Sequence, residues 1–353
     1  MKRIILHIGT EKTATTSLQA FFSLNHSQLS EKGIWYPNSE SLDYCHRNAH
    51  FPLAASVMET CPDFVSRNKY FQPEELFQKL LHDFDQRDEK TLLLSSEHFS
   101  SRCSRPERNL KLAKLLDGRN VQILVYLRPQ DEMLLSSYST FLKSGGKKTL
   151  EEVSRKMWLR PKALYFNHSL MVRRWLANFP KENFSVRIFQ KPQLVDGDIY
   201  ADVMNFLNIE LESPKYSDRL NPPISKELAD FLYLANQHFP TWQEGDRKGF
   251  EQGQRFRGEI VPLFAGGRSI KNLLSPELMQ DTRAYFSEYN RQLCDLVRPD
   301  LNGQLFIDPP ITEIVGADEH SNDNYFSEEF VAWVINQWSA KSGFHRKISA
   351  LSR

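Results

Sequence analysis

A lysine and a group of hydroxyl side chains lie close together near the start of the chain, at residues 9–17, GTEKTATTS. They follow the apolar run IILHI and precede the helical pattern SLQAFFSLN. A helix that begins here leaves about four backbone N–H groups unpaired and carries a partial positive charge at its N-terminus. Such a corner binds phosphate through backbone donors, and hydroxyls and a lysine strengthen it. Residues 9–17 therefore predict a phosphate-binding turn, in which Gly9 allows the sharp bend.

This stretch departs from the common phosphate-loop pattern GxxxxGK[ST]. Ala14 stands where the second glycine of that pattern would be, and Lys12 comes before the run of hydroxyl residues at 13–17. A well-capped helix with a surface lysine is the alternative interpretation. The gathering of these residues at the end of the first strand of an α/β pattern favours the phosphate site.

Residues 6–19, LHIGTEKTATTSLQ, resemble the loop with which sulfotransferases bind the 5′-phosphosulfate of PAPS (3′-phosphoadenosine 5′-phosphosulfate). The likeness is to bacterial carbohydrate-type members, whose segment is similar to H(I/V)GxxKTGTTSLQ, with Ala14 where glycine is usual. It implies PAPS as the cofactor, PAP (adenosine 3′,5′-bisphosphate) as the product, and no strict need for a metal. The implied cofactor-binding residues are Gly9, Thr10, Lys12, Thr13, Ala14, Thr15, Thr16 and Ser17.

An arginine and a serine eight residues apart follow another apolar run. VQILVYL is followed by Arg128, and Ser136 lies in the helical pattern beyond it. A planar guanidinium binds a phosphate through two parallel hydrogen bonds, and a hydroxyl on a helix adds a donor. In the family that residues 6–19 resemble, this pair binds the 3′-phosphate of PAPS. Taken singly, an exposed arginine and a surface serine are ordinary, but their spacing together with the first motif favours a nucleotide site.

The implied reaction is in-line transfer of a sulfuryl group to an acceptor hydroxyl, which resembles phosphoryl transfer and puts charge on the leaving oxygen. Lys12 is the natural stabiliser of that oxygen, and the acceptor needs a general base. Glu97 and His98 follow the apolar run TLLLSS, at the edge where α/β proteins place ligands. His50 lies beyond GIWYP, and its neutral imidazole accepts a proton near pH 7. The sequence leaves the choice among these three open.

Aromatic and basic residues elsewhere are candidates for contact with the acceptor, which the resemblance implies to be a carbohydrate or glycan. The candidates are Trp35, His50, Tyr165, Arg257 and Arg268. The two arginines fall in glycine- and arginine-rich stretches, 244–259 and 264–272, that are expected to be loops. Core packing of the aromatic rings and ordinary solvated charge are the alternatives.

Alternating strand-like and helix-like patterns predict the elements that must position these residues. Strand-like runs fall at 4–8, 33–37, 91–96, 121–127 and 184–189. Helix-like patterns fall at 15–30, 73–86, 106–116, 130–143, 165–179 and 198–207, and then at 224–238, 275–298 and 327–340. Strands that are apolar almost throughout indicate an α/β fold, a mostly parallel sheet between two layers of helices in a P-loop NTPase-like arrangement. A polar, proline-containing connector separates an α/β core at 1–210 from a mostly helical part at 211–353.

The 353 residues are 40% hydrophobic and carry a formal net charge of +1, which suits one large or two modest domains and gives no nucleic-acid footprint. The four cysteines are scattered, as expected of reduced thiols, and no metal-ligand spacing appears. Without a signal-peptide pattern or an apolar run of membrane-spanning length, we expect a cytoplasmic protein with no membrane span.

Two other functions share the phosphate corner. A P-loop kinase or other phosphotransferase should show GK[ST] and an acid for magnesium, yet the run VQILVYL is followed by Arg128 where an aspartate is expected. A nucleotide-binding protein of polysaccharide assembly that lacks turnover is the second alternative. The identity of the acceptor and the oligomeric state are left open.

Overall fold

The computed structural model describes residues 2–38, 45, 48–59, 73–160, 164–217, 224–264, 266–308 and 325–340. The chain packs into two compact units, each assembled from separate stretches. Unit 1 comprises Met1–Pro129, Pro161–Asn221 and Phe286–Ile307, and unit 2 comprises Gln130–Arg160, Pro222–Tyr285 and Asp308–Arg353. These stretches interleave along the chain, and the division into domains at 1–210 and 211–353 stays a prediction.

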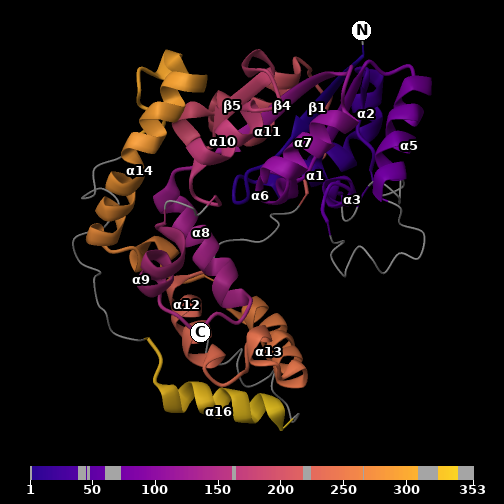
Figure 1. Cartoon of the computed structure of the whole chain (residues 1–353). Helices are drawn as coiled ribbons and strands as arrows, with labels where there is room; N and C mark the ends of the chain where they lie inside the picture. Colours follow the sequence, from indigo (N-terminus) through magenta and orange to yellow (C-terminus); the bar gives the residue numbers. More distant parts are fainter. Residues whose placement is uncertain are drawn as a thin grey trace. The chain divides into compact units, whose positions relative to one another are not determined.

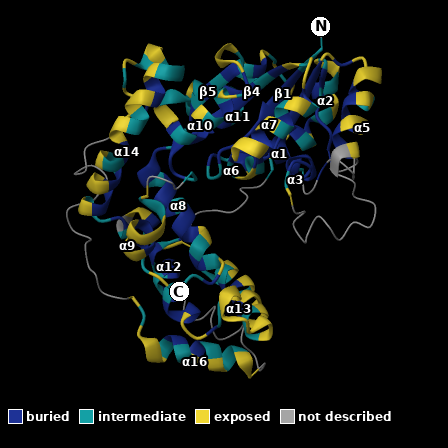
Figure 2. Ribbon diagram, in the orientation of Figure 1, coloured by how far each residue is buried: buried dark blue, intermediate teal, exposed yellow. Residues whose placement is uncertain are grey.

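Unit 1 is built on a sheet in which each described pair of neighbouring strands is parallel. Its strands are β1 (Arg3–His7), β2 (Ile34–Trp35), β3 (Thr91–Ser95), β4 (Asn120–Leu127) and β5 (Phe184–Ile188), in the spatial order β2-β3-β1-β4-β5. The expected strands are thus confirmed, although β2 is shorter than the run at 33–37. Figure 2 shows β1 and β4 largely in the colour of buried residues, which is why their sequences are apolar almost throughout.

Helices cover both faces of this sheet (Figure 1). One face packs on α3 (Phe51–Ala55), α5 (Pro73–Gln86), α6 (Glu97–Arg102), α7 (Pro106–Leu115) and α10 (His168–Leu176). The other face packs on α1 (Thr15–Leu24), α2 (His26–Glu31) and α11 (Ile199–Leu207). Ile4 and Leu6 of β1 point to the first layer and Ile5 to the second, because successive side chains of a strand alternate. The three-layer α/β/α fold is therefore as expected.

The late stretch 286–307 completes the core of unit 1. Leu293 and Phe306 are buried in the same cluster as Ile4 and Leu6. Farther along this stretch, the backbone of Ile307 exchanges two hydrogen bonds with the Gln190 side chain, 2.8 and 2.9 Å long.

One expected helix, 15–30, is two helices, because the chain bends at Asn25. The Asn25 amide donates to the carbonyl oxygens of Phe21 and Lys215, both over 2.8 Å, and its oxygen accepts from the Lys215 N–H. The side chain therefore satisfies backbone groups at the bend and fixes residue 215 beside α1. The other helix patterns are confirmed within a few residues at their ends.

The described helices of unit 2 are α8 (Gln130–Lys143), α9 (Leu150–Val153), α12 (Lys226–Asn236), α13 (Arg247–Ile260) and α16 (Glu328–Ser339). A further helix, α14 (Pro276–Val297), begins in unit 2 and continues into unit 1. Phe231, Phe256 and Val331 form part of the buried core that joins α12, α13 and α16.

Helix α13 overturns the expectation of a loop at 244–259. Its glycines suggested a loop, but the Asp246 side chain accepts from the Gly249 N–H at 3.0 Å and caps the helix start. A Cβ at Gly253 would lie 2.9 Å from the Cβ of Phe239, so this glycine permits close packing instead of breaking the helix. Arg257 therefore lies on a helix and is buried.

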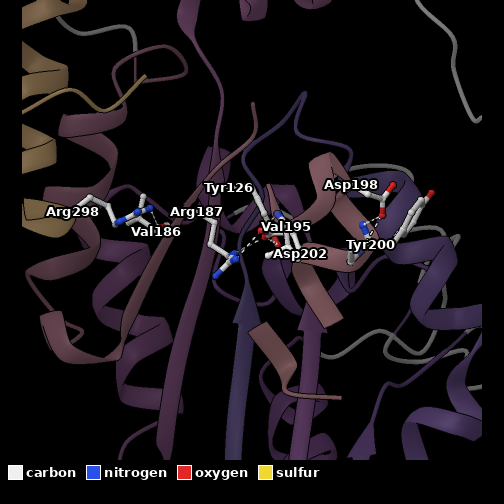
Figure 3. Close-up of polar contacts among 9 residues, drawn as sticks. Tyr126, Val186, Arg187, Val195, Asp198, Tyr200, Asp202 and Arg298 are labelled. Carbon is white, nitrogen blue, oxygen red and sulfur yellow. Dashed lines mark hydrogen bonds and ion pairs between the residues drawn. The ribbon is translucent and has the colours of Figure 1, made fainter. Parts of the chain in front are cut away.

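A buried polar network ties β4 and β5 to α11 (Figure 3). Asp202 of α11 accepts from the Tyr126 hydroxyl at 2.7 Å, from both Nε and Nη2 of Arg187, and from the Val195 N–H at 3.1 Å. The Asp202 side chain is 1% exposed and that of Arg187 is 26% exposed. Each carboxylate oxygen accepts more than one hydrogen bond, so the buried charge is well compensated.

Within the described ranges, every helix is too short or too polar to cross a lipid bilayer.

Replacing Asp202 with alanine should cost about 3 kcal/mol of unfolding free energy, because Arg187 and the Tyr126 hydroxyl then lose their shared acceptor. Asp198 is the matched control on the same helix, since it only caps the start of α11 and its loss should cost about 1 kcal/mol. Urea unfolding of both variants tests this, and equal losses would contradict the structural role of the network.

Candidate active site

The predicted phosphate-binding turn, residues 9–17, and Glu97 lie at the carboxyl edge of the sheet, after neighbouring strands. β1 ends at His7 and β3 ends at Ser95, and these two residues are paired in register. The chain leaves β1 for α1 on one face of the sheet and leaves β3 for α6 on the other. Open α/β sheets bind ligands where neighbouring strands part in this way.

Gly9 brings the turn into contact with the start of α6. Its φ of +100° lies in the region that favours glycine. A Cβ at this position would be 3.0 Å from the Cα of Glu97, so any side chain would collide with that backbone. Both the turn and the contact therefore require glycine here.

Three threonines hold the turn in shape. The hydroxyls of Thr13 and Thr15 donate to the carbonyl oxygen of Thr10 over 2.6 and 2.9 Å. The Thr10 hydroxyl and N–H donate to the carbonyl oxygen of Tyr126 over 3.1 and 3.0 Å. A hydroxyl that has donated its only proton has none left for a phosphate oxygen, which only accepts. The geometry thus favours a structural role for these hydroxyls.

Two further hydroxyls lie at the start of α1. Thr16 is exposed, and Ser17 is partly exposed and shares a side-chain hydrogen bond with Tyr200. Of the hydroxyls in the turn, these two are the better placed to meet a ligand.

Helix α1 begins without a side-chain cap. Its N-cap residue is Ala14, with φ of +59°, and a methyl group accepts no hydrogen bond. Leu18 N–H to Ala14 O, 3.0 Å, is the first bond of the helix ladder. The backbone N–H groups of residues 15–17 therefore start the helix without a capping oxygen, at its positive end. The alternative of an ordinary capped helix is wrong, and an anion would supply the missing acceptor.

Arg128 contacts the phosphate-binding turn directly. Its Nη1 donates to the carbonyl oxygen of Lys12 over 3.1 Å, and its guanidinium lies 5.6 Å from the ring centre of Phe189. The Nε2 of His168 donates to the Arg128 carbonyl oxygen over 2.8 Å. Burial lowers the pKa of His168 to about 4, so the ring is neutral and serves as a fixed donor. Arg128 belongs to unit 1, whereas Ser136, on α8, belongs to unit 2. That the two side chains bind the same phosphate stays a prediction.

Glu97 is fixed by hydrogen bonds at the start of α6. Ser96 caps this helix by accepting from the His98 N–H over 3.3 Å. The Glu97 carboxylate accepts through Oε2 from Gln19 Nε2 over 3.0 Å. Gln19 is buried on α1, so it links the helix of the phosphate-binding turn to the carboxylate beside it.

Both candidate histidines belong to unit 1, where His50 is buried and His98 is partly exposed. His98 packs edge-on against Phe51 with ring centres 4.2 Å apart, and burial lowers its pKa against the opposing charges of Glu97 and Glu11. Its Nδ1 is buried without a hydrogen-bond partner. His98 as a whole is partly exposed, and its role as a base stays a prediction.

His50 uses both ring nitrogens in structural hydrogen bonds. Its Nδ1 accepts from the Ser95 N–H over 2.9 Å, and its Nε2 donates to the Pro37 carbonyl oxygen over 2.8 Å. The residue is 0% exposed, and burial lowers its pKa to about 4. This geometry favours a clamp between the segment before α3 and the end of β3, not a general base.

The remaining acceptor candidates are engaged in packing or ion pairs. Trp35 stacks on Phe84 with ring centres 6.2 Å apart and pairs with Leu92 near the start of β3, away from the carboxyl edge. Tyr165 packs edge-on against Phe166. In unit 2, Arg268 forms an ion pair with Glu227 at 2.8 Å, and Arg257 is buried on α13.

Sequence reasoning missed two polar residues of the site. Gln19 lies within the helical pattern SLQAFFSLN, four residues after Thr15 on the same face of α1. His7 lies in the first strand-like run, and its Nδ1 lies 2.8 Å from the Ser95 hydroxyl. Burial lowers the pKa of His7 to about 3. Among the described residues, no group of three or more His, Cys, Asp or Glu side chains is placed to hold a metal ion.

No family model matches the chain. An uncharacterized protein of Archaeoglobus fulgidus is 30% identical over 117 residues, which is 33% of this chain and 30% of that protein, so the chain spans less than a third of it. The crystal structure of a sulfotransferase from Alicyclobacillus acidocaldarius aligns with 72% of this chain and 96% of its own, with 18% identity and a TM-score of 0.40. The α/β fold class itself follows from the sheet order and the two helix layers.

We predict that His50 stays neutral well below the pH at which a free histidine takes up a proton. The unfolded chain protonates His50 near pH 6.5 and the folded chain near 4, so stability falls as the pH drops through this window, by about 2 kcal/mol between pH 7 and 5. NMR should show unchanged His50 ring signals over that range, and His50→Gln should lose less stability on acidification. A His50 signal that titrates near pH 6.5 would restore it as a candidate base.

Proposed function

We propose that the protein transfers a sulfuryl group from PAPS to an acceptor hydroxyl, on a carbohydrate or glycan, and releases PAP. One observation carries the proposal: the uncapped start of α1 lies in the same turn as Lys12, and this turn contacts the backbone of Glu97. An anion site and a carboxylate are thus neighbours at the carboxyl edge of the sheet. The motif resemblance at residues 6–19 supplies the identity of the cofactor. A cytoplasmic location is part of the proposal.

The residues of the turn fit the anionic end of PAPS. Three backbone N–H groups at the start of a helix suit a tetrahedral oxyanion, and Lys12 adds a positive charge beside them. Thr16 and Ser17 are the hydroxyls of the turn with side chains that reach the surface. Arg128 and Ser136 are proposed to hold the 3′-phosphate, as the resemblance implies.

PAPS, when bound, supplies the sulfuryl group and a phosphate leaving group. Lys12 would stabilise the negative charge that develops on the bridging oxygen as its bond to sulfur breaks. Glu97 would take the proton of the acceptor hydroxyl as the new oxygen–sulfur bond forms. Gln19 holds Glu97 Oε2, which orients the carboxylate and directs its other oxygen to this task. Glu97 is preferred to His50 because both His50 ring nitrogens are already used.

A phosphotransferase is the second candidate, and one observation favours it. The parallel order β2-β3-β1-β4-β5, with a phosphate-binding turn after β1, also suits nucleoside triphosphates. The two candidates differ in the nucleotide that they bind, so binding separates them.

We expect PAP to raise the thermal unfolding temperature in a dose-dependent way and ATP with magnesium to leave it unchanged, because a ligand that binds only the folded state stabilises it. Lys12→Ala should keep most of the PAP effect while sulfuryl transfer from PAPS falls about 100- to 1,000-fold. Lys32→Ala, at the end of α2, is the matched control. Stabilisation by ATP with magnesium and none by PAP would replace the sulfotransferase proposal with the phosphotransferase one.

Glu97→Gln should lower the rate of transfer about 100-fold or more without weakening PAP binding, because the amide cannot take a proton but keeps the shape of the side chain. Glu107→Gln, in the first turn of α7, removes an exposed carboxylate from the same unit as a control. The rate is measured with labelled PAPS and a panel of sugars. Full activity of Glu97→Gln would remove this residue from the role of base.

A further inference from the structure

Unit 2 contains a buried guanidinium whose charge has no counterpart among the described residues. Arg257 on α13 is 2% exposed. Its Nη1 donates to Asn236 Oδ1 over 3.0 Å, but Nε and Nη2 are buried without a hydrogen-bond acceptor. Most buried polar groups in proteins are paired, so this pattern calls for an explanation.

The two nitrogens without an acceptor form one edge of the guanidinium, the edge that binds a carboxylate or sulfate through two parallel hydrogen bonds. Other arginines of this chain use that same edge. Arg87 binds Glu89, and Arg298 binds Asp300, each through Nε and Nη2 to the two carboxylate oxygens. Arg257 presents the same pair of donors, yet no carboxylate of the described chain meets them.

The position of this edge is fixed by the surrounding backbone. The Asn236 amide that holds Arg257 donates to the carbonyl oxygens of Leu142 and Gly146, over 2.9 and 2.8 Å. Gly145, with φ of +94°, lies so close that a Cβ there would be 3.0 Å from Nη2. The turn after α8 and the Asn236 side chain thus hold the guanidinium in one orientation. Binding an anion there would therefore cost little side-chain conformational entropy.

The charge of Arg257 persists despite its burial. Burial lowers its pKa to about 10, which still leaves the group cationic near neutral pH. Burial is the cause of this shift, with no contribution from a nearby carboxylate. The negative end of α8 favours a cation but supplies no acceptor to Nε or Nη2. A buried cation without a counter-ion is destabilising, so an anion that reached this edge would be bound.

We propose that Arg257 is the centre of a binding site for a single oxyanion group, a sulfate or a carboxylate, held through Nε and Nη2. The site consists of residues of unit 2, with Asn236 and Gly145 as its supports. Phosphate shares this chemistry, and the anion comes either free from solution or attached to a sugar. The inference does not depend on the proposed sulfuryl transfer.

The test uses the full chain with ¹⁵N-labelled arginine and follows the Nε–H signals by NMR. The Arg257 signal is identified by its loss in Arg257→Lys. We expect sodium sulfate to shift it in a saturable way, while sodium chloride at equal ionic strength does not. Lys12→Ala should respond like the unmodified protein, which separates this site from the phosphate-binding turn. An Arg257 signal that shows no saturable response to sulfate overturns the proposal, and so does a response that Lys12→Ala abolishes.

Calorimetry in the presence of saturating PAP gives an independent measure. Arg257→Lys keeps the charge but removes the two-pronged edge, so it should weaken sulfate binding about tenfold or more. Arg255→Lys, on the exposed side of α13, should leave the affinity unchanged. Glucose 6-sulfate, glucuronate and glucose distinguish a sugar-borne anion from a free one. Undiminished sulfate binding by Arg257→Lys would contradict the assignment.

Discussion

The close approach of Gly9 to Glu97 is the constraint on which the candidate site depends. It exists because β1 and β3 are neighbours that end in register, His7 beside Ser95, before their chains part to opposite faces of the sheet. The hydrogen bonds from Ser96 N–H to His7 O, 3.0 Å, and from Ser100 N–H to Ile8 O, 3.2 Å, continue this contact beyond the strands. A positive helix end and a carboxylate are therefore set side by side by the backbone of two strands, and only the absence of a side chain at residue 9 allows it.

Around this contact, most of the polar side chains form hydrogen bonds to the backbone of the turn and of the strands beside it. The hydroxyls of Thr13 and Thr15 donate to the backbone of the turn, and the Thr10 hydroxyl donates to the Tyr126 carbonyl oxygen of β4. Arg128 donates to the Lys12 carbonyl oxygen. These bonds hold the turn in shape without a ligand, and they leave the backbone N–H groups at the start of α1 and the hydroxyls of Thr16 and Ser17 to bind one. The buried neutral rings of His50 and His168 serve the same purpose, since each fixes a backbone segment at the edge of the sheet.

The sheet, the order of its elements and the turn between β1 and α1 could all be predicted, because buried parallel strands leave apolar runs and the turn gathers unusual residues in a short stretch. That this turn binds phosphate stays a prediction. The features that the sequence could not reveal depend on long-range contacts. The glycines of α13 indicated a loop, yet position 253 requires glycine because Phe239 packs closely against the helix there. His50 matched a base by type and position, but its burial and its bond to Pro37 are invisible in the sequence. The role of Gln19 as a hydrogen-bond donor to Glu97 depends on the position of Glu97 after β3, which the sequence around Gln19 does not reveal.

The interleaving of the two units sets an order for their assembly during synthesis. The first 221 residues of the chain supply the five described strands of the sheet. Leu293 and Phe306, which complete its core, and Ile307, whose backbone bonds the Gln190 side chain, come much later in the chain. The ribosome delivers this last piece only after residues 222–285 of the other unit have emerged. The apolar surface that Leu293 and Phe306 cover therefore stays open on the nascent chain until residues 286–307 have been made.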